Sequence, residues 1–299
     1  MRTAAIVVNP ISGSASRRRA LAEFCDTLRA GGMEARIRET SAPGDGAAIA
    51  KEEAARGTHV VVAAGGDGTV NDVARGLTEH GPDAPALAIL PRGTSNLVAR
   101  DLGLPFRPRD NARVVLEGAP SRMDVGMANG RLFVACVGVG FDAHVVRRLA
   151  KARRGHISFA TWIVPIAKSV AEYEFRPLRV TATDGASAEG VFAMFLNTRP
   201  YAAWFTPAPA ARRDDGILDA VVLARRGALD VPRWAWKAWR GTLASDHSAT
   251  FLRAASYRIE AQHPLPAQID GDVGGETPVD ILVRPAALRV LTPAAKGRS

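Results

Sequence analysis

The residues GGDGT at 65–69 follow the apolar run VVVAA and precede a helical pattern that begins at Val70. Glycines let backbone N–H groups approach phosphate oxygens, and the positive end of a helix favours anions. A bare carboxylate would repel phosphates, so Asp67 makes chemical sense if a divalent cation stands between them. The alternative is a tight turn in which Asp67 is an ordinary helix cap. The motif matches neither the common dinucleotide fingerprint nor the P-loop fingerprint.

Two further polar turns have the same setting. NPISG follows a predicted strand at 3–8, and PRGTSN follows one at 86–90. In parallel sheets, ligands bind outside the carboxyl ends of the strands. The three turns would therefore meet at one sheet edge, and together they predict a phosphate site better than any one alone.

Strands and helices alternate through the first third of the chain, which predicts an α/β domain with a parallel sheet over residues 1–122. The predicted strands are 3–8, 34–40, 59–64 and 86–90, and the predicted helices are 16–29, 46–56, 70–77 and 94–101.

After Arg122 the pattern changes to short strands separated by turn residues. This pattern predicts an antiparallel sandwich or barrel-like domain over 123–285. Two helical stretches interrupt it, at 143–173 and 229–243. The tail 286–299 supplies one more strand, which is free to return to the first domain.

Composition limits the class of protein. The chain has 299 residues, 47% of them apolar, which suits two domains with sizeable cores. Cys25 and Cys136 form no disulfide framework, which favours a reducing, cytoplasmic compartment. The N-terminus lacks the pattern of a secretory signal. The longest apolar stretch, 157–171, is broken by Pro165 and Lys168, so no membrane-spanning segment is expected.

The formal net charge is +9. Nucleotides, nucleic acids and anionic membrane surfaces would attract such a chain, although solvated arginines explain the charge equally well. No recognisable nucleic-acid motif accompanies the charge. The six histidines are scattered and predict no metal cluster.

Taken in order along the chain, the motifs resemble the diacylglycerol kinase and sphingosine kinase superfamily, and most of all its soluble bacterial lipid kinases. GGDGT alone is shared with NAD kinases and phosphofructokinase-like folds. Its combination with later segments is much more specific. The segments that carry the resemblance are VVNPISGSA, ETSAPGDGAAIA, AAGGDGTVNDVARGL, LAILPRGTSNLVARDLGLP, DVGMANGRLFVACVGVGFDA, PAARRDDGILDAVVL and QIDGDVGGETPVDILVRPAALRVLTP.

The resemblance implies an NAD-kinase-like or phosphofructokinase-like first domain, a second β-sandwich domain, and ATP and Mg²⁺ as cofactors. It also implies residues that line the nucleotide and its phosphates. These are Asn9, Ser12, Gly13, Thr40, Gly65, Gly66, Asp67, Gly68, Thr69, Val70, Asn71, Thr94 and Asn96.

In the second domain the resemblance implies a structural Mg²⁺ held by Asp215 and by the main-chain carbonyls of Arg212 and Ile217. Carboxylate and carbonyl oxygens suit a hard cation. It further implies a catalytic base in the segment usually written Asp-Gly-Glu, which here is Asp270-Gly271-Asp272. Either Asp270 or Asp272 could take that role.

The sequence departs from the family pattern at two positions. Asp272 is one methylene shorter than the expected glutamate, which predicts reduced activity or altered acceptor geometry. Leu97 stands where some relatives have an aspartate that supports the magnesium network.

Two segments suit a membrane interface. A basic cluster (Arg147, Arg148, Lys151, Arg153 and Arg154) precedes ISFATWIVPIA, and PRWAWKAW carries Arg233, Lys237 and nearby Arg240 on one helical stripe. Basic and aromatic residues side by side are typical of interfacial segments. Packing of both segments into the second domain is the alternative.

The leading hypothesis is therefore an ATP-dependent kinase that phosphorylates a hydroxyl of diacylglycerol or a similar lipid. It would act in the cytoplasm, peripheral to the inner face of the membrane, as a monomer or homodimer, within phospholipid metabolism. An NAD kinase or another small-polyol kinase is one alternative. A non-catalytic nucleotide-binding or lipid-binding homologue is another.

Overall fold

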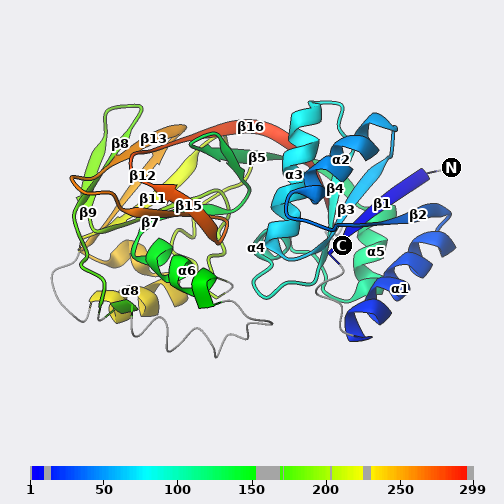
Figure 1. The fold of residues 1–299 in the computed structure, drawn as a ribbon, viewed down its shortest axis with the longest axis horizontal. Helices are drawn as coiled ribbons and strands as arrows, with labels where there is room; N and C mark the ends of the chain where they lie inside the picture. The colour runs from blue at the N-terminus through cyan, green and yellow to red at the C-terminus, as the bar shows by residue number, and fades with distance from the viewer. Residues whose placement is uncertain are drawn as a thin grey trace, which may run out of the picture. The chain divides into compact units, whose positions relative to one another are not determined.

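The computed structural model describes residues 2–9, 15–152, 169–170, 172–202, 204–224 and 230–294. The chain forms two compact units, drawn in Figure 1. Unit 1 comprises Met1–Met123 with Ala286–Ser299, and unit 2 comprises Asp124–Pro285. Among the described residues, no helix is both long and apolar enough to cross a bilayer.

Unit 1 is built on a parallel sheet. Its strands are β1 (Arg2–Val8), β2 (Met33–Glu39), β3 (Val60–Gly65) and β4 (Ala86–Pro91), in the order β2-β1-β3-β4. β16 (Val279–Thr292) begins in unit 2, and its second part joins this sheet beside β4, where Val290 pairs with Leu87. The parallel order brings the carboxyl ends of all four strands to one edge.

Helices cover both faces of that sheet, because the central strands β1 and β3 carry unbroken apolar runs, AAIVV and VVVAA. α1 (Ala15–Ala30) packs with α5 (Pro108–Glu117), and α2 (Asp45–Ala55) packs with α3 (Asp67–His80) (Figure 1). Alternate strand residues such as Ile6, Val62 and Leu90 share a core with Phe24 and Leu28 of α1. The short helix α4 (Leu97–Asp101) follows β4.

Unit 2 is an antiparallel sandwich. One sheet has the order β12-β11-β10-β7-β14-β15. The other layer holds β9, β8, β13 and the first part of β16, and β5 pairs with β6 in a hairpin. Phe195, Val139 and Ile269 of the first sheet share a buried core with Val180 and Ile259 of the second layer. The bounds are β5 (Ala119–Ala128), β6 (Arg131–Phe133), β7 (Cys136–Gly140), β8 (Leu178–Ala182), β9 (Ser187–Gly190), β10 (Phe192–Leu196), β11 (Leu218–Leu223), β12 (Ala249–Ala254), β13 (Ser256–Glu260), β14 (Pro266–Ile269) and β15 (Asp272–Glu276).

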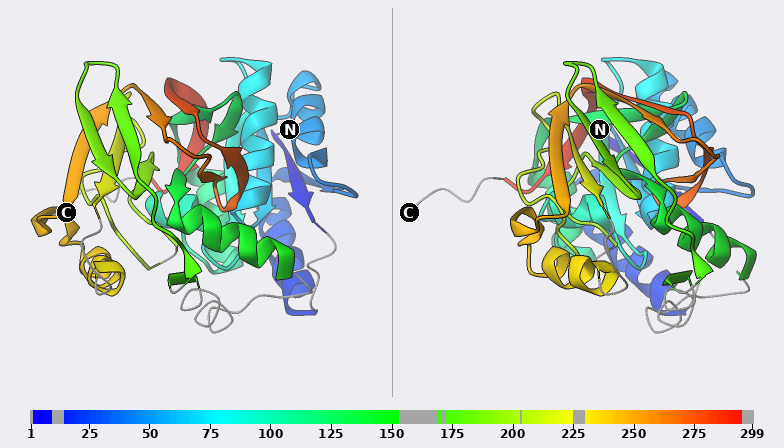
Figure 2. Two further views of the ribbon diagram at one scale, coloured as in Figure 1. Left: turned by 60° about the vertical axis from the view of Figure 1, so that its left-hand side comes forward. Right: turned by 90° about the vertical axis from the view of Figure 1, so that its left-hand side faces the viewer.

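Three helical segments complete the described part of unit 2. α6 (Phe141–Ala152) packs on β7, β14 and β15. α8 (Asp230–Trp239) packs with the 3₁₀ turn η2 (Leu243–Ser245), which contacts β12. Both views of Figure 2 draw α6 and α8 on the same side of unit 2.

The predicted fold class is confirmed: an α/β unit with a parallel sheet and a β-sandwich unit. Some elements differ from the prediction. The helix predicted at 94–101 begins only at Leu97, because Asn96 adopts a left-handed conformation with φ 49°. α5 was not predicted, since its sequence PRDNARVVLE has few apolar positions. The roles assigned to the domains, nucleotide binding for 1–122 and lipid binding for 123–285, stay predictions.

Candidate functional site

The first group of predicted residues lies at the carboxyl ends of the unit 1 strands. Asn9 directly follows β1 and Thr40 directly follows β2, and these strands are neighbours in register. The Thr40 amide donates to the Val8 carbonyl at 2.9 Å, which continues the pairing past the strand ends. Ser12 and Gly13 lie outside the described residues.

The GGDGT and PRGTSN turns pack directly on each other. The Arg92 amide donates to the Gly65 carbonyl at 2.8 Å. A Cβ added to Gly93 would lie only 2.4 Å from the Cα of Gly66, so neither turn has room for a side chain there. Two glycines of this edge are therefore required by contact between the turns, before any ligand is considered.

Asp67 links the same two turns. Its Oδ1 accepts a hydrogen bond from the Leu97 amide at 2.6 Å, at the start of α4. The carboxylate therefore caps a helix, although not the helix that carries it. This contact explains an acidic residue in the turn without a metal, and it makes Asp67 a structural residue whatever else it does.

Asn96 shapes the second turn. Its Oδ1 accepts from the Gly93 amide and its Nδ2 donates to the Gly93 carbonyl, both at 2.8 Å. The side chain is buried and both of its ends are engaged within the turn. Thr94, by contrast, is exposed at this edge. The geometry favours Thr94 over Asn96 as the residue of this turn that can contact a ligand.

The first turn of α3 carries the backbone amide groups of this edge of the sheet. The Val70 amide donates to the Gly66 carbonyl at 3.1 Å, so the amides before it have no partner within the helix. Val70 itself is buried in the core. Thr69 packs on Gly65, where a Cβ would lie 2.3 Å from the Thr69 Oγ1, and Asn71 lies half-buried in the same turn.

Gly68 differs from the other glycines of this edge. It is exposed, its φ is not in the left-handed region, and a Cβ there would meet no atom of the described residues within 4 Å. Neither packing nor backbone conformation requires glycine at this position. Open space beside amides that have no partner within the helix is what an anion needs for close approach at a helix N-terminus.

Arg92 was missed by the sequence reasoning. Its Nε and one terminal nitrogen are buried with no hydrogen-bond partner in the described part of the chain. Burial lowers the pKa of its guanidinium, with smaller effects from Glu23 and Arg17 of α1. A half-buried cation with unused donors beside the two turns is suited to an anion. Its place inside PRGTSN was the available signal.

The second group of predicted residues lies in the turn between β14 and β15. The carboxylate of Asp270 accepts hydrogen bonds from the amides of Val134, Ala135 and Cys136 at 2.7, 2.9 and 2.9 Å. Asp270 also has a left-handed backbone conformation, with φ 49°. Its carboxylate therefore fastens the turn to the segment before β7.

A buried polar chain supports this turn from the other side. The Gln268 Oε1 accepts from the Gly271 amide at 2.8 Å, and its Nε2 donates to Oδ2 of Asp142 at 3.1 Å. The Tyr201 hydroxyl donates to the same oxygen. Burial raises the pKa of Asp142 to about 6, although hydrogen bonds from Tyr201 and Gln268 oppose the rise.

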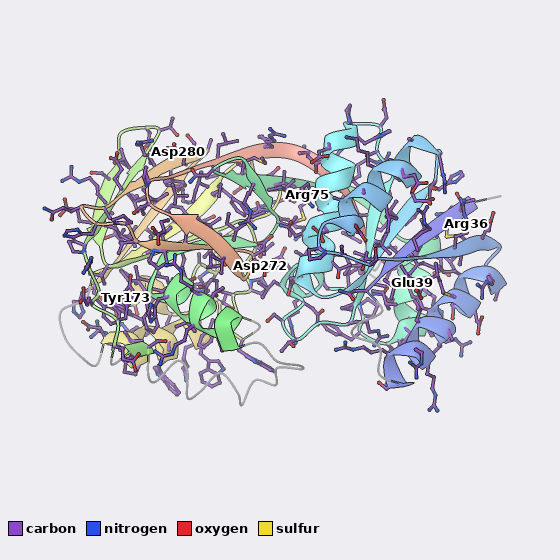
Figure 3. All side chains as sticks on the ribbon, viewed as in Figure 1. Arg36, Glu39, Arg75, Tyr173, Asp272 and Asp280 are labelled. Atoms are coloured by element: carbon purple, nitrogen blue, oxygen red, sulfur yellow. The ribbon has the colours of Figure 1, made fainter. Side chains whose placement is uncertain are left out.

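Asp272, labelled in Figure 3, is the first residue of β15 and is paired in register with Ile269. It is exposed, whereas Asp270 is only partly accessible. Of the two predicted catalytic carboxylates, Asp272 is the one placed to meet a substrate.

The predicted metal ligands lie in the loop before β11. Oδ1 of Asp215 accepts from the Ile217 amide at 3.2 Å, and its Oδ2 pairs with Arg253 at 2.6 Å. Arg253 also pairs with the buried Asp219 at 3.2 Å, and Oδ2 of Asp219 is buried without a hydrogen-bond partner among the described residues. Arg212 is exposed in the same loop.

Carboxylate and carbonyl oxygens fit a hard cation in chemical type, and this loop supplies both, with the unsatisfied carboxylate oxygen of Asp219 directly after it in β11. In the described ranges, no group of three or more His, Cys, Asp or Glu side chains is arranged to hold a metal ion. Asp124, another residue not predicted, is buried and accepts from the Gly216 amide at 2.7 Å. It holds this loop in place.

The two predicted membrane segments have different outcomes. ISFATWIVPIA and the basic residues Arg153 and Arg154 lie outside the described residues. Arg147 and Arg148 of α6 pair with Glu276 and Glu172. PRWAWKAW forms most of α8, where Trp234 is buried and Trp236 and Trp239 are exposed.

Comparison with known proteins gives matches over nearly the whole chain. Residues 3–128 match the model of the diacylglycerol kinase catalytic domain. Residues 135–292 match that of the YegS C-terminal NAD kinase beta sandwich-like domain.

Individual relatives agree. The chain is 28% identical to "Diacylglycerol kinase" of Bacillus subtilis, over 99% of this chain and 98% of the relative. It is 28% identical to "Probable lipid kinase YegS-like" of Chromohalobacter salexigens, over 88% and 85%. A crystal structure of a diacylglycerol kinase from Bacillus anthracis superposes with a TM-score of 0.76 at 24% identity, covering 98% of this chain and 97% of that one. The chain belongs to the family of bacterial diacylglycerol kinases and YegS-like lipid kinases.

Proposed function

We propose that the protein is an ATP-dependent lipid kinase that transfers the γ-phosphoryl group to a hydroxyl of diacylglycerol or a similar lipid. The observation that carries this proposal is the contrast within the glycine turns of unit 1. Gly66 and Gly93 are needed for contact between the turns, whereas Gly68 leaves open space at the N-terminus of α3. A ligand with phosphate groups accounts for that space.

In this proposal the nucleotide phosphates lie along the start of α3. The amides of its first turn, which have no partner within the helix, and the helix dipole stabilise negative charge. Arg92 contributes a cation with unused donors, and Thr94, Asn9 and Thr40 line the same edge. Asp67 and Asn96 hold the two turns in position through Leu97 and Gly93.

The proposal includes a Mg²⁺ ion that binds in the loop before β11. Asp215 and the carbonyls of Arg212 and Ile217 would hold it, with Asp219 adjacent. A bound Mg²⁺ would supply positive charge that stabilises this acidic loop. Arg253 already neutralises both carboxylates in part. A fitting test is the midpoint of thermal unfolding, which Mg²⁺ should raise in the wild type and not in Asp215→Asn.

The chemical step is a direct displacement. The lipid hydroxyl oxygen forms a bond to the γ-phosphorus while the bond to the bridging oxygen of ADP breaks. The hydroxyl proton passes to a carboxylate, for which we propose Asp272 as general base. Asp270 is a positioning residue, because its carboxylate is occupied by three backbone amides. A cytoplasmic protein bound peripherally to the membrane would meet such a lipid.

The test is phosphorylation of a total lipid extract with labelled ATP, followed by mass spectrometry of the product. Diacylglycerol, phosphatidylglycerol, sphingoid bases and NAD are offered separately. We expect a phosphorylated lipid and no product from NAD. Product from NAD alone would replace the proposal with an NAD kinase, and ATP binding without any product would indicate a non-catalytic homologue.

Three variants test the assigned roles. Asp272→Asn should lose roughly a hundredfold or more in turnover while it still binds ATP, since a positioned base contributes about that much. Asp272→Glu, which has the side chain usual in the family, should keep or raise activity. At Asp67 we prefer the variant Asp67→Asn to Asp67→Ala, because the side-chain oxygen of asparagine can still accept the hydrogen bond from the backbone N–H of Leu97. Full turnover by a folded Asp272→Asn protein contradicts the base assignment.

A further inference from the structure

The helix α8 has an unusual distribution of side chains. Its exposed positions are Pro232, Ala235, Trp236, Trp239 and, directly after the helix, Arg240. This spacing of three and four residues is that of one face of a helix. An apolar stripe at this spacing normally faces the core, whereas this one faces solvent.

The opposite face of α8 is already satisfied by the protein. Trp234 is buried, and its Nε1 donates to Ser248 Oγ at 2.8 Å. Ala238 is also buried. The face of α8 that packs on the core is therefore the face of Trp234 and Ala238, and the exposed tryptophans do not belong to it. They form a second apolar face that the described part of unit 2 does not cover.

The exposed aromatic area is large. Trp236 is 59% exposed and Trp239 is 54% exposed, and their rings lie 5.2 Å apart. A third residue, Trp204, is 55% exposed on the adjoining segment. That segment is tied to the end of α8, because the Thr206 amide donates to the Ala238 carbonyl at 2.8 Å. We call Trp204, Trp236, Trp239 and Arg240 the tryptophan face.

The charges around this face are one-sided. Both acids near it, Asp230 and Asp246, have side chains that are at most 5% exposed. Arg233 and Lys237 pair with Asp246 from the solvent side, and the Arg240 guanidinium lies 6.0 Å from the Trp236 ring centre. Solvent therefore meets aromatic rings and cations on this helix, with the negative charges covered.

We propose that the tryptophan face is the surface by which this protein binds an anionic lipid bilayer. Tryptophan rings with flanking arginine and lysine suit the headgroup region, where the rings enter the interface and the cations meet anionic headgroups. A second copy of the chain would instead bring the Arg240 side chains of two identical faces together, which is unfavourable. The proposal rests on the proposed function, because a kinase that acts on lipids must reach a bilayer.

Vesicle binding tests the proposal apart from catalysis. The probes are vesicles of phosphatidylcholine alone and of phosphatidylcholine with phosphatidylglycerol, measured by co-sedimentation. We expect wild-type binding to the anionic vesicles that weakens with salt. The double variant Trp236→Ala/Trp239→Ala should bind roughly tenfold or more weakly, since affinity scales with the apolar area buried.

The matched control is Phe106→Ala in unit 1. Phe106 is also an exposed aromatic residue, at 42%, and the Arg100 guanidinium lies 5.2 Å from its ring centre. This variant should bind vesicles as the wild type does. Brominated acyl chains give an independent readout: they should quench wild-type tryptophan fluorescence, and the quenching should fall strongly in the double variant. Near-ultraviolet circular dichroism checks that each variant is folded.

The outcomes separate the two proposals. Asp272→Asn should bind vesicles normally while losing phosphate transfer. Wild type that binds vesicles through the tryptophans but phosphorylates no lipid would refute the proposed function alone. Equal vesicle binding by wild type and the folded double variant, or no quenching in wild type, would overturn the tryptophan face. The proposed bilayer surface would also be overturned if the wild type formed a dimer that the double variant no longer forms.

Discussion

Two turns carry most of the proposed chemistry, and they differ in what holds them. The turn after β3 is held by backbone contact, with Gly66 against Gly93 and the Arg92 amide on the Gly65 carbonyl, and by one carboxylate, that of Asp67 on the Leu97 amide. The turn after β14 is held by side chains, with Asp270 on three amides and Gln268 on Gly271. A site for phosphate needs amides without a helical partner, whereas a site for a base needs a carboxylate that solvent can reach, as it can reach Asp272.

The largest effect on stability is expected at Asp270. Asp270→Ala removes a carboxylate that satisfies three amides, and leaving them unpaired should lower the free energy of unfolding by about 4 kcal/mol. Asp270→Asn keeps one acceptor oxygen and tolerates the left-handed conformation, so it should lie between alanine and wild type. Denaturant titration measures all three proteins. Equal stability of alanine variant and wild type would show that the carboxylate does not fasten the turn.

Gly93→Ala tests the backbone contact in unit 1. Its Cβ would lie 2.4 Å from the Cα of Gly66, and no side chain can move aside. We expect a loss of about 3 kcal/mol of unfolding free energy, as in overpacked cores. The comparison variant is Ala63→Gly, which removes a buried methyl group from the same sheet and adds no contact. Gly81→Ala is not used, because Gly81 has a positive φ that would add backbone strain of its own. Little loss in Gly93→Ala would mean that the two turns can separate.

The side-chain turn should also respond to pH through Asp142. Burial raises its pKa from 3.8 to about 6, so between these values the folded protein keeps a proton that the unfolded chain releases. Its contribution to the free energy of unfolding therefore falls as the pH rises from about 4 to about 6, by about 3 kcal/mol. The difference between wild type and Asp142→Asn, measured by denaturant titration across this range, should follow that fall. A constant difference would contradict it.

The smallest effect, of opposite sign, is expected at Gly68. A Cβ there meets no atom of the residues that the structure describes, and alanine is the better helix former, so Gly68→Ala should raise the free energy of unfolding by about 0.5 kcal/mol. ATP binding should nevertheless weaken, because the added methyl group fills the space beside the amides. Calorimetric titration with ATP measures the second effect. Unchanged ATP affinity would remove the main support for the nucleotide site.

Much of unit 1 could be predicted from the sequence. Valine-rich strands such as 60–64 alternate with helical spacing, and the glycine turns follow the strand ends. The exact role of Asp67 could not be predicted, because its acceptor contact is with Leu97, thirty residues later. Sequence patterns give the residues of a turn but not the partner that each side chain finds across the fold.

The partners of the other site residues could not be predicted from the sequence for the same reason. Asp270 and Asp272 are two residues apart, and what distinguishes them is the fold around them: the amides of Val134, Ala135 and Cys136 bind Asp270. The tryptophans of α8 lie on more than one face of the helix, so their spacing alone does not reveal which face is buried. Whether Asp272 is the base stays a prediction, as does each nucleotide ligand.

The contact between Gly66 and Gly93 also limits how this edge of the sheet can change. Where side chains touch, a larger residue at one position can be compensated by a smaller one at the other. Here both partners already have no side chain, so no substitution at Gly66 can rescue a larger residue at Gly93. A search for second-site suppressors of Gly93→Ala should therefore recover backbone-shifting changes in the flanking strands and helices, and none at position 66.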